Sequence, residues 1–152
     1  MTDDDRYHLI GQLQRHEDAQ ALENRKRTFY PYRDSVGKLT IGWGRNIQDR
    51  GLSDEEADYL LANDIAAAED DLRRAFPWFA DLDSIRQSAL VNIRFNVGMA
   101  SLLTFTRALA ALAHRQYGQA ADEFFDSKWS TQVGARAAEL CAQIRTGQWQ
   151  TT

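Results

Sequence analysis

The sequence contains only one cysteine and two prolines among its 152 residues. The single cysteine, Cys141, excludes an intramolecular disulfide, which fits folding in a reducing compartment. It lies in an apolar helical pattern with no activating histidine nearby. We therefore predict a small buried side chain at this position and no cysteine nucleophile.

Long apolar runs and an export pattern are also missing. No apolar stretch approaches the roughly 20 residues that span a bilayer, so we expect no stable membrane insertion. The opening Met-Thr-Asp-Asp-Asp lacks the basic and then apolar order of a secretory signal. We therefore expect synthesis in the cytoplasm.

Several functional signatures are absent as well. The net charge is −4, with the acidic excess in residues 1–75, and no concentrated basic face suggests a nucleic-acid partner. The histidines do not have zinc-site spacing, and neither a Gly-x-Ser-x-Gly motif nor a phosphate-binding glycine loop occurs. The sequence therefore predicts no metal and no organic cofactor.

Apolar residues make up 43% of the chain and aromatic residues 11%, enough to fill the core of one ordinary domain. Apolar spacing predicts a first helix over about residues 4–22. Residues 30–32, Tyr-Pro-Tyr, favour extended backbone. Residues 34–45 combine a glycine turn with strand-forming residues and predict a small hairpin or short sheet.

A long helix is expected over about residues 53–74, because Ser53 and Glu56 form a capping-box pattern at its start. The pattern beyond residue 75 is almost wholly helical, with breaks expected at Gly98 and Gly118. The predicted fold class is therefore α+β and mostly α. It has a small N-terminal lobe with a β-hairpin, a long connecting helix and an all-helical C-terminal lobe.

Two carboxylates are the strongest candidates for chemistry. Glu17 lies near the end of the first helix, Asp34 begins the glycine turn, and Thr40 follows on the expected strand. Glycosidic cleavage requires one carboxyl group that donates a proton and a second that is ionised. Taken alone, each residue also has a plainer explanation, as a glutamate on a helix surface or an aspartate in a turn.

The segment Tyr32–Asn46, YRDSVGKLTIGWGRN, resembles the signature of the phage lysozymes of glycoside hydrolase family 24, the T-even phage lysozyme type. Residues 15–17, Arg-His-Glu, resemble the family's catalytic glutamate segment. Other segments resemble, in the same order, its inter-lobe helix, its central C-lobe helix and its closing motifs: residues 51–53, 92–98, 126–129 and 145–149. Several ordered motifs are more specific than any one of them.

The resemblance implies a monomeric muramidase that hydrolyses the β-1,4 bond between N-acetylmuramic acid and N-acetylglucosamine in bacterial peptidoglycan. Glu17 would be the general acid, Asp34 would position or activate the attacking water, and Thr40 would hold that water from the other side. A neighbouring base, Lys128 or Arg136, would modulate Glu17. The enzyme would accumulate in the host cytoplasm and reach the cell wall after another protein permeabilises the membrane.

The resemblance also implies which residues line the saccharide cleft: Asn92, Phe95, Asn96 and Gln132. Core packing is the alternative for the phenylalanine, and helix-surface polarity is the alternative for the three amides. As a single domain over residues 1–152, the chain would have an N-lobe at about 14–52, the connecting helix, and a C-lobe at about 75–152. The N-terminal helix would pack on that C-lobe.

Two features depart from the family's pattern. The sixteen residues between Glu17 and Asp34 are about twice the usual number, which leaves Glu23 as an alternative acid. Arg45 stands where a histidine is common, and we expect it to pair with Asp64 on the long helix.

Three other functions remain open at this point. A non-catalytic peptidoglycan-binding module would follow if the longer spacing displaced Glu17. A lytic transglycosylase would cut the same bond without water, but Asp34 and Thr40 have a role only if water is placed. A structural helical protein with a chance carboxylate pair is disfavoured by the ordered motifs.

Overall fold

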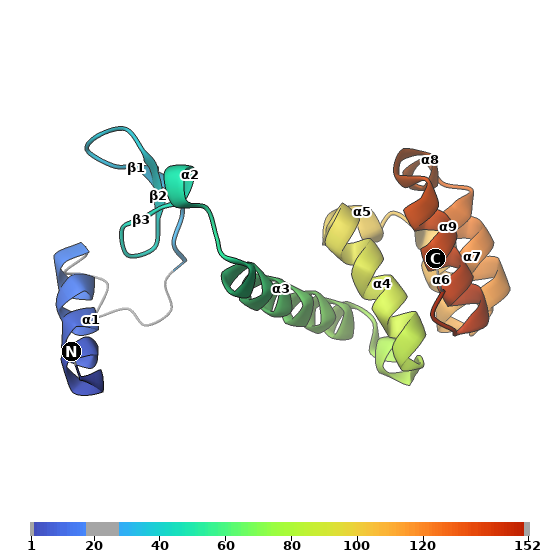
Figure 1. The fold of residues 1–152 in the computed structure, drawn as a ribbon. Helices are drawn as coiled ribbons and strands as arrows, with labels where there is room; N and C mark the ends of the chain where they lie inside the picture. Colours follow the sequence, from blue (N-terminus) through green and yellow to red (C-terminus); the bar gives the residue numbers. More distant parts are fainter. Residues whose placement is uncertain (1, 18–27, 151–152) are drawn as a thin grey trace. The chain divides into compact units, whose positions relative to one another are not determined.

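The computed structural model describes residues 2–17 and 28–150, without the side chains of Arg15 and Glu17 (Figure 1). The chain divides into two compact units, Met1–Ala57 and Asp58–Thr152, which we call unit 1 and unit 2. The predicted lobe boundaries and the packing of the N-terminal helix on the C-lobe stay predictions.

Unit 1 begins with helix α1 (Asp3–Glu17), and the predicted extension to residue 22 lies outside the described residues. Three aspartates fill its first turn, where negative charge interacts favourably with the helix dipole. The hydroxyl of Thr2 accepts a hydrogen bond from the Asp5 backbone N–H at 3.1 Å, and the Asp5 carboxylate accepts one from the Thr2 N–H at 2.8 Å. This reciprocal cap fixes where the helix starts.

Three short antiparallel strands follow in the order β1-β2-β3, so the predicted hairpin is extended by one strand. Thr40, in the middle strand, pairs with Tyr32 on one side and Asn46 on the other. A four-residue helix, α2, follows directly, capped by the Asn46 side chain. These elements are β1 (Tyr32–Arg33), β2 (Leu39–Ile41), β3 (Arg45–Asn46) and α2 (Ile47–Arg50).

The long helix α3 (Asp54–Ala75) begins with the predicted capping box. The Ser53 hydroxyl accepts from the Glu56 backbone N–H at 3.2 Å, and the Glu56 carboxylate accepts from the Ser53 N–H at 2.9 Å. The same carboxylate binds Arg45 through two hydrogen bonds of 2.6 Å, so the expected Asp64 partner is wrong. Asp64 lies eight residues further along the helix, a rise of about 12 Å.

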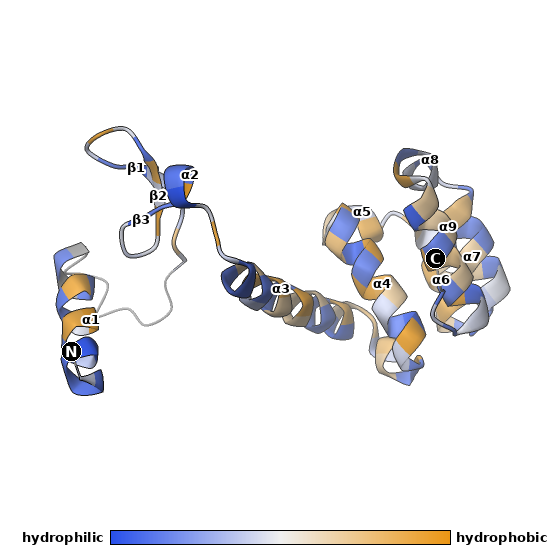
Figure 2. Cartoon of the chain, viewed as in Figure 1, coloured by the Kyte–Doolittle hydropathy of each residue, from blue (hydrophilic) through white to orange (hydrophobic). Residues whose placement is uncertain are grey.

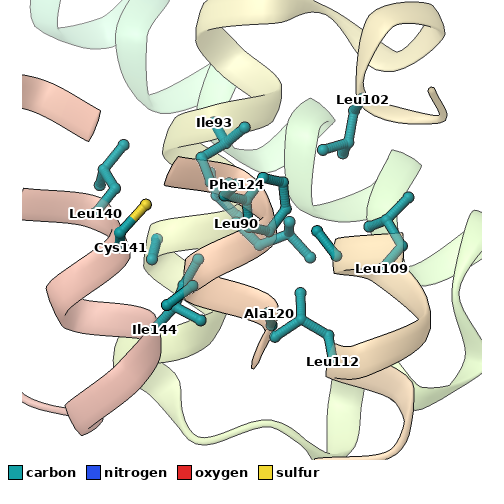
Figure 3. Packing of buried hydrophobic residues seen from close by; sticks show 14 of the residues in the cluster. Leu90, Ile93, Leu102, Leu109, Leu112, Ala120, Phe124, Leu140, Cys141 and Ile144 are labelled. Atoms are coloured by element: carbon teal, nitrogen blue, oxygen red, sulfur yellow. The ribbon is translucent and has the colours of Figure 1, made fainter. Parts of the chain in front are cut away.

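Helices dominate unit 2, and apolar residues alternate with hydrophilic ones along them (Figure 2). Within it, α7 packs against α6 and α9, and α4 packs against α9. Side chains from these four helices meet in one apolar core, to which Phe124 contributes a fully buried ring (Figure 3). Cys141 is buried in it, as predicted, and burial raises the pKa of its thiol to about 11. The elements after α3 are η1 (Pro77–Asp81), α4 (Ser84–Val97), α5 (Met99–Leu102), α6 (Thr106–Ala113), α7 (Tyr117–Phe125), α8 (Lys128–Val133) and α9 (Ala135–Thr146).

The break predicted at Gly98 is confirmed, because this glycine ends α4 with a positive φ of 77°. The break predicted at Gly118 is wrong, since Gly118 lies inside α7. The chain turns just before α7, where Arg115 adopts a φ of 57°. A Cβ atom at Gly118 would lie 3.4 Å from the Arg145 guanidinium, an ordinary van der Waals contact, so a side chain is tolerated at this helical position. None of the helices described in either unit is long and apolar enough to span a membrane.

Candidate active site

Asp34 closes the loop between β1 and β2 with its own side chain. Its Oδ1 accepts hydrogen bonds from the backbone N–H groups of Val36 at 3.0 Å and Lys38 at 2.8 Å. Its backbone N–H donates to the Lys38 carbonyl at 3.0 Å, and its carbonyl accepts from the Gly37 N–H at 2.9 Å. Gly37 has a φ of 82°, a conformation that glycine adopts without strain. The turn chemistry read from the sequence therefore also fixes the orientation of the carboxylate.

Thr40 lies next to this carboxylate. Its hydroxyl is 3.1 Å from the Lys38 carbonyl and 3.4 Å from Asp34 Oδ2, the oxygen that the loop backbone leaves free. The side chain is buried, with 2% of the residue exposed. The structure therefore brings Asp34 and Thr40 together, and Thr40 contacts the carboxylate from inside the unit.

Polar contacts around the loop hold it in place. Lys38 Nζ binds the Asp49 carboxylate at 3.0 Å, and this bond keeps the pKa of Asp49 below its ordinary value. Arg33 donates to the Gly37 carbonyl at 2.8 Å. Since Lys38 is engaged by Asp49, the Asp34 carboxylate forms no ion pair with any residue in the described ranges.

The structure does not describe the side chain of the expected general acid. Glu17 is the last residue of α1 and its side chain lies outside the described residues. Its alternative, Glu23, lies outside them entirely. The role of Glu17 therefore stays a prediction.

Three of the predicted saccharide-binding residues share one face of α4, at positions i, i+3 and i+4. The Asn92 Oδ1 accepts two hydrogen bonds from Arg136, from Nε at 3.0 Å and from Nη2 at 2.6 Å. The Asn96 Oδ1 accepts one from Trp129 Nε1 at 2.7 Å. Phe95 is 43% exposed, so its alternative explanation as a core residue is wrong.

Gln132, the fourth predicted residue, lies exposed on α8. Lys128, at the start of the same short helix, is exposed as well. Arg136, the other expected modulator of Glu17, is the partner of Asn92. Sequence separation explains why local spacing does not predict that pairing, since the two positions are 44 residues apart.

Unit 2 also contains a pocket of about 400 Å³, a size typical of small-molecule sites. Sequence reasoning missed its charged residues Glu69 and Glu139. Glu139 was accessible to such reasoning, because it lies three residues after Arg136 and therefore on the same face of α9. The lining residues are Leu61, Ile65, Glu69, Ser88, Val91, Asn92, Phe95, Arg136, Glu139, Gln143 and Trp149.

The described residues contain no candidate metal site. In residues 2–17 and 28–150, no group of three or more His, Cys, Asp or Glu side chains is placed to hold a metal ion.

The comparisons with known proteins match this chain to lysozymes. The family described as Phage lysozyme matches residues 22–145. Two relatives from Dictyostelium discoideum, described as probable T4-type lysozymes 1 and 2, are each 26% identical over 145 aligned positions. Each alignment covers 76% of this chain and 85% of the relative. The family match includes Asp34, Thr40 and the α4 face but begins after Glu17.

Proposed function

Because this chain belongs to the phage lysozyme family, we propose that it is a muramidase acting on bacterial peptidoglycan. Family membership makes it a lysozyme-type hydrolase. The proposal adds the bond, which is the β-1,4 linkage between N-acetylmuramic acid and N-acetylglucosamine. The observation that carries it is the pairing of Asp34 with Thr40, in which one carboxylate oxygen is fixed by two backbone N–H groups.

In the proposed mechanism, Glu17 donates its proton to the leaving glycosidic oxygen. Asp34 accepts a proton from a water molecule through Oδ2 as that water attacks the anomeric carbon from the opposite face. The burial of Thr40 and its contact with Oδ2 support a role in which Thr40 helps to place the water by fixing this oxygen. The product is a reducing sugar with inverted configuration.

The α4 face supplies the binding part of the proposal. Asn92, Phe95 and Asn96 would contact the glycan, and Gln132 would do so from α8. The exposure of Phe95 supports this role, because an exposed aromatic ring offers an apolar surface to a sugar. We further propose that the enzyme acts as a monomer, is made in the host cytoplasm, and reaches the wall after another protein permeabilises the membrane.

Peptidoglycan digestion followed by mass spectrometry tests the mechanism. The parent chain is compared with Glu17→Gln, Glu23→Gln and Glu55→Gln, the last a matched control on the exposed start of α3. We expect reducing muropeptides from the parent and the Glu55 variant, and a loss of about 10²–10⁴-fold in Glu17→Gln, the range for a general acid.

The other outcomes separate the alternatives. Loss in Glu23→Gln with normal activity in Glu17→Gln would transfer the acid role to Glu23. Anhydro-sugar products would identify a lytic transglycosylase. If the parent releases no product but binds peptidoglycan, the chain is a binding module and the proposal is wrong.

A further inference from the structure

The register of the sheet places Lys38 directly opposite Asp34. Because Arg33 pairs with Leu39, the next opposed residues are Asp34 and Lys38, and the Asp34 N–H donates to the Lys38 carbonyl at 3.0 Å. Side chains that lie opposite one another in an antiparallel pair have Cβ atoms about 5 Å apart, and opposite charges at such positions attract. From the register alone, an ion pair between these two residues is expected.

The structure shows a different pairing. Lys38 Nζ binds Asp49 Oδ1 at 3.0 Å, and Asp34 forms no ion pair with any residue that the structure describes. Asn46 fixes the orientation of Asp49, because it accepts from the Asp49 backbone N–H and donates from Nδ2 to Asp49 Oδ2, both at 3.0 Å. The hydrogen bonds from Lys38 and Asn46 lower the pKa of Asp49, which favours its ionised form. Asp49 is therefore a prearranged anion that competes with Asp34 for the lysine.

The other cation beside Asp34 is also directed elsewhere. Arg33 precedes Asp34 in the chain, and its Nη1 donates to the Gly37 carbonyl at 2.8 Å. In the described ranges, the hydroxyl of Thr40 is the hydrogen-bond partner of Asp34 Oδ2. An ammonium group at this oxygen would stabilise the ionised carboxylate and make it a weaker proton acceptor. Both neighbouring cations are therefore kept from the oxygen on which the proposed chemistry depends.

We propose that Asp49 is a positioning residue for the reaction, which holds the Lys38 ammonium group away from Asp34 and so keeps Asp34 Oδ2 open to the attacking water. This inference rests on the proposed function, because it adds a residue to the same site. Asp49 is exposed and Lys38 is half-buried, and an ion pair so accessible to solvent adds little to stability. The effect of the pair is on where the lysine points.

Asp49→Asn removes the charge that holds Lys38. It keeps the backbone N–H that bonds to Asn46 and a side-chain oxygen that can accept from it, so α2 stays capped. Lys38 is then expected to pair with Asp34 across the loop. Muramidase activity should fall about 3–10-fold at neutral pH, because a paired carboxylate is a weaker base.

The pH profile gives a second readout of the same variant. The acid limb of kcat/KM should move to lower pH in Asp49→Asn, by about one unit or less for a pair this accessible to solvent. Asp54→Asn makes the same chemical change at the exposed start of α3 and is the matched control, with the parent's activity and profile expected.

The double variant Lys38→Gln/Asp49→Asn distinguishes positioning from a structural role. It removes the cation that Asp49 restrains, while the backbone contacts of residue 38 with Asp34 and Thr40 remain. We expect activity and the acid limb to return to within about twofold of the parent, because the two side chains act through one contact. If the bridge served only to hold the loop, both variants would lack it and would lose activity equally.

Two results would overturn the inference: a parental pH profile and activity in Asp49→Asn, or equal losses in the single and double variants. Titration of the Asp34 carboxyl carbon, followed by NMR, is a readout that does not depend on cleavage. It should move to lower pH in Asp49→Asn and return in the double variant. If it moves but the parent cuts no peptidoglycan, only the muramidase function is wrong. If the parent cuts and the titration stays in place, only this inference is wrong.

Discussion

Different kinds of interaction stabilise the interior of unit 1 and the interior of unit 2. Unit 2 has a continuous apolar core, in which side chains such as Leu90 and Phe124 are fully buried. Among the described residues of unit 1, Thr40 is the one buried side chain, and it is polar. The order in unit 1 comes instead from hydrogen bonds and ion pairs around Asp34, Asp49 and Glu56.

This difference in stabilisation follows from the kind of surface that each unit has to present. Apolar burial contributes about 25 cal/mol for each Å² removed from water and tolerates many arrangements of the surface above it. Exposed ion pairs contribute little to stability but fix direction. A loop that must hold a carboxylate at its surface therefore depends on polar contacts, while the helical unit that carries the α4 face depends on its core.

The largest expected effect is in the core of unit 2. Phe124→Ala should lower the free energy of unfolding of this unit by about 3–5 kcal/mol, because it leaves a cavity where a fully buried ring stood. The neighbouring Phe125→Ala is the matched control, since that ring is 51% exposed and its loss should change stability by about 0.5 kcal/mol or less. Urea unfolding measures the loss of stability in each variant. Equal losses would contradict the prediction that Phe124 belongs to the apolar core and Phe125 does not.

In unit 1, the loss of a single polar contact should lower stability measurably. Ser53→Ala removes the hydroxyl that caps α3 and should cost about 0.5–2 kcal/mol. Ser84→Ala is the control, because Asp83 rather than Ser84 caps α4. Amide hydrogen exchange, read separately for the two units, should show lost protection near the start of α3 in the first variant. Unchanged protection there would mean that the capping box does not stabilise unit 1.

Thr40→Val keeps the shape of the buried side chain and removes its hydroxyl. We expect a loss of about 0.5–1.5 kcal/mol, the usual net value of one hydrogen bond, with reduced muramidase activity from a less firmly held Asp34. Thr131→Val, exposed on α8, should change neither quantity. If Thr40→Val retains full activity on peptidoglycan, Thr40 is a structural residue only.

The smallest effect concerns pH. The Arg45 guanidinium, followed by the Ser53 backbone N–H, holds the pKa of Glu56 below its ordinary value of 4.5. Its contribution to stability is therefore fully present at pH values above 4.5 and is lost as the pH falls through the lowered pKa. The difference in melting temperature between the parent and Glu56→Gln should shrink in that acidic range, and a difference independent of pH would contradict the pairing.

Much of the local structure was predictable because its signals lie within a few residues of one another. The capping box of Ser53 and Glu56, the turn at Asp34 and the break at Gly98 are all short-range patterns, and the structure confirms them. The mostly α fold class and the phage lysozyme family are likewise confirmed. The catalytic roles of Glu17, Asp34 and Thr40 stay predictions.

Two predictions were wrong, the partner of Arg45 and the helix break at Gly118. Arg45 had several acids within reach along the chain, and the first turn of α3 brought Glu56 rather than Asp64 to it. The break predicted at Gly118 falls instead just before α7, where Arg115 adopts a φ of 57°. Neither choice is encoded in the local spacing.

Local patterns were enough to predict the long helix that begins at Ser53, the mostly helical part beyond residue 75 and the turn that holds Asp34, because periodicity and capping act over one or two turns of chain. The contacts of Arg136 with Asn92 and of Trp129 with Asn96, across 44 and 33 residues of sequence, follow instead from the packing of the folded chain. Those contacts depend on how α4, α8 and α9 pack, because the residues that meet come from separate helices.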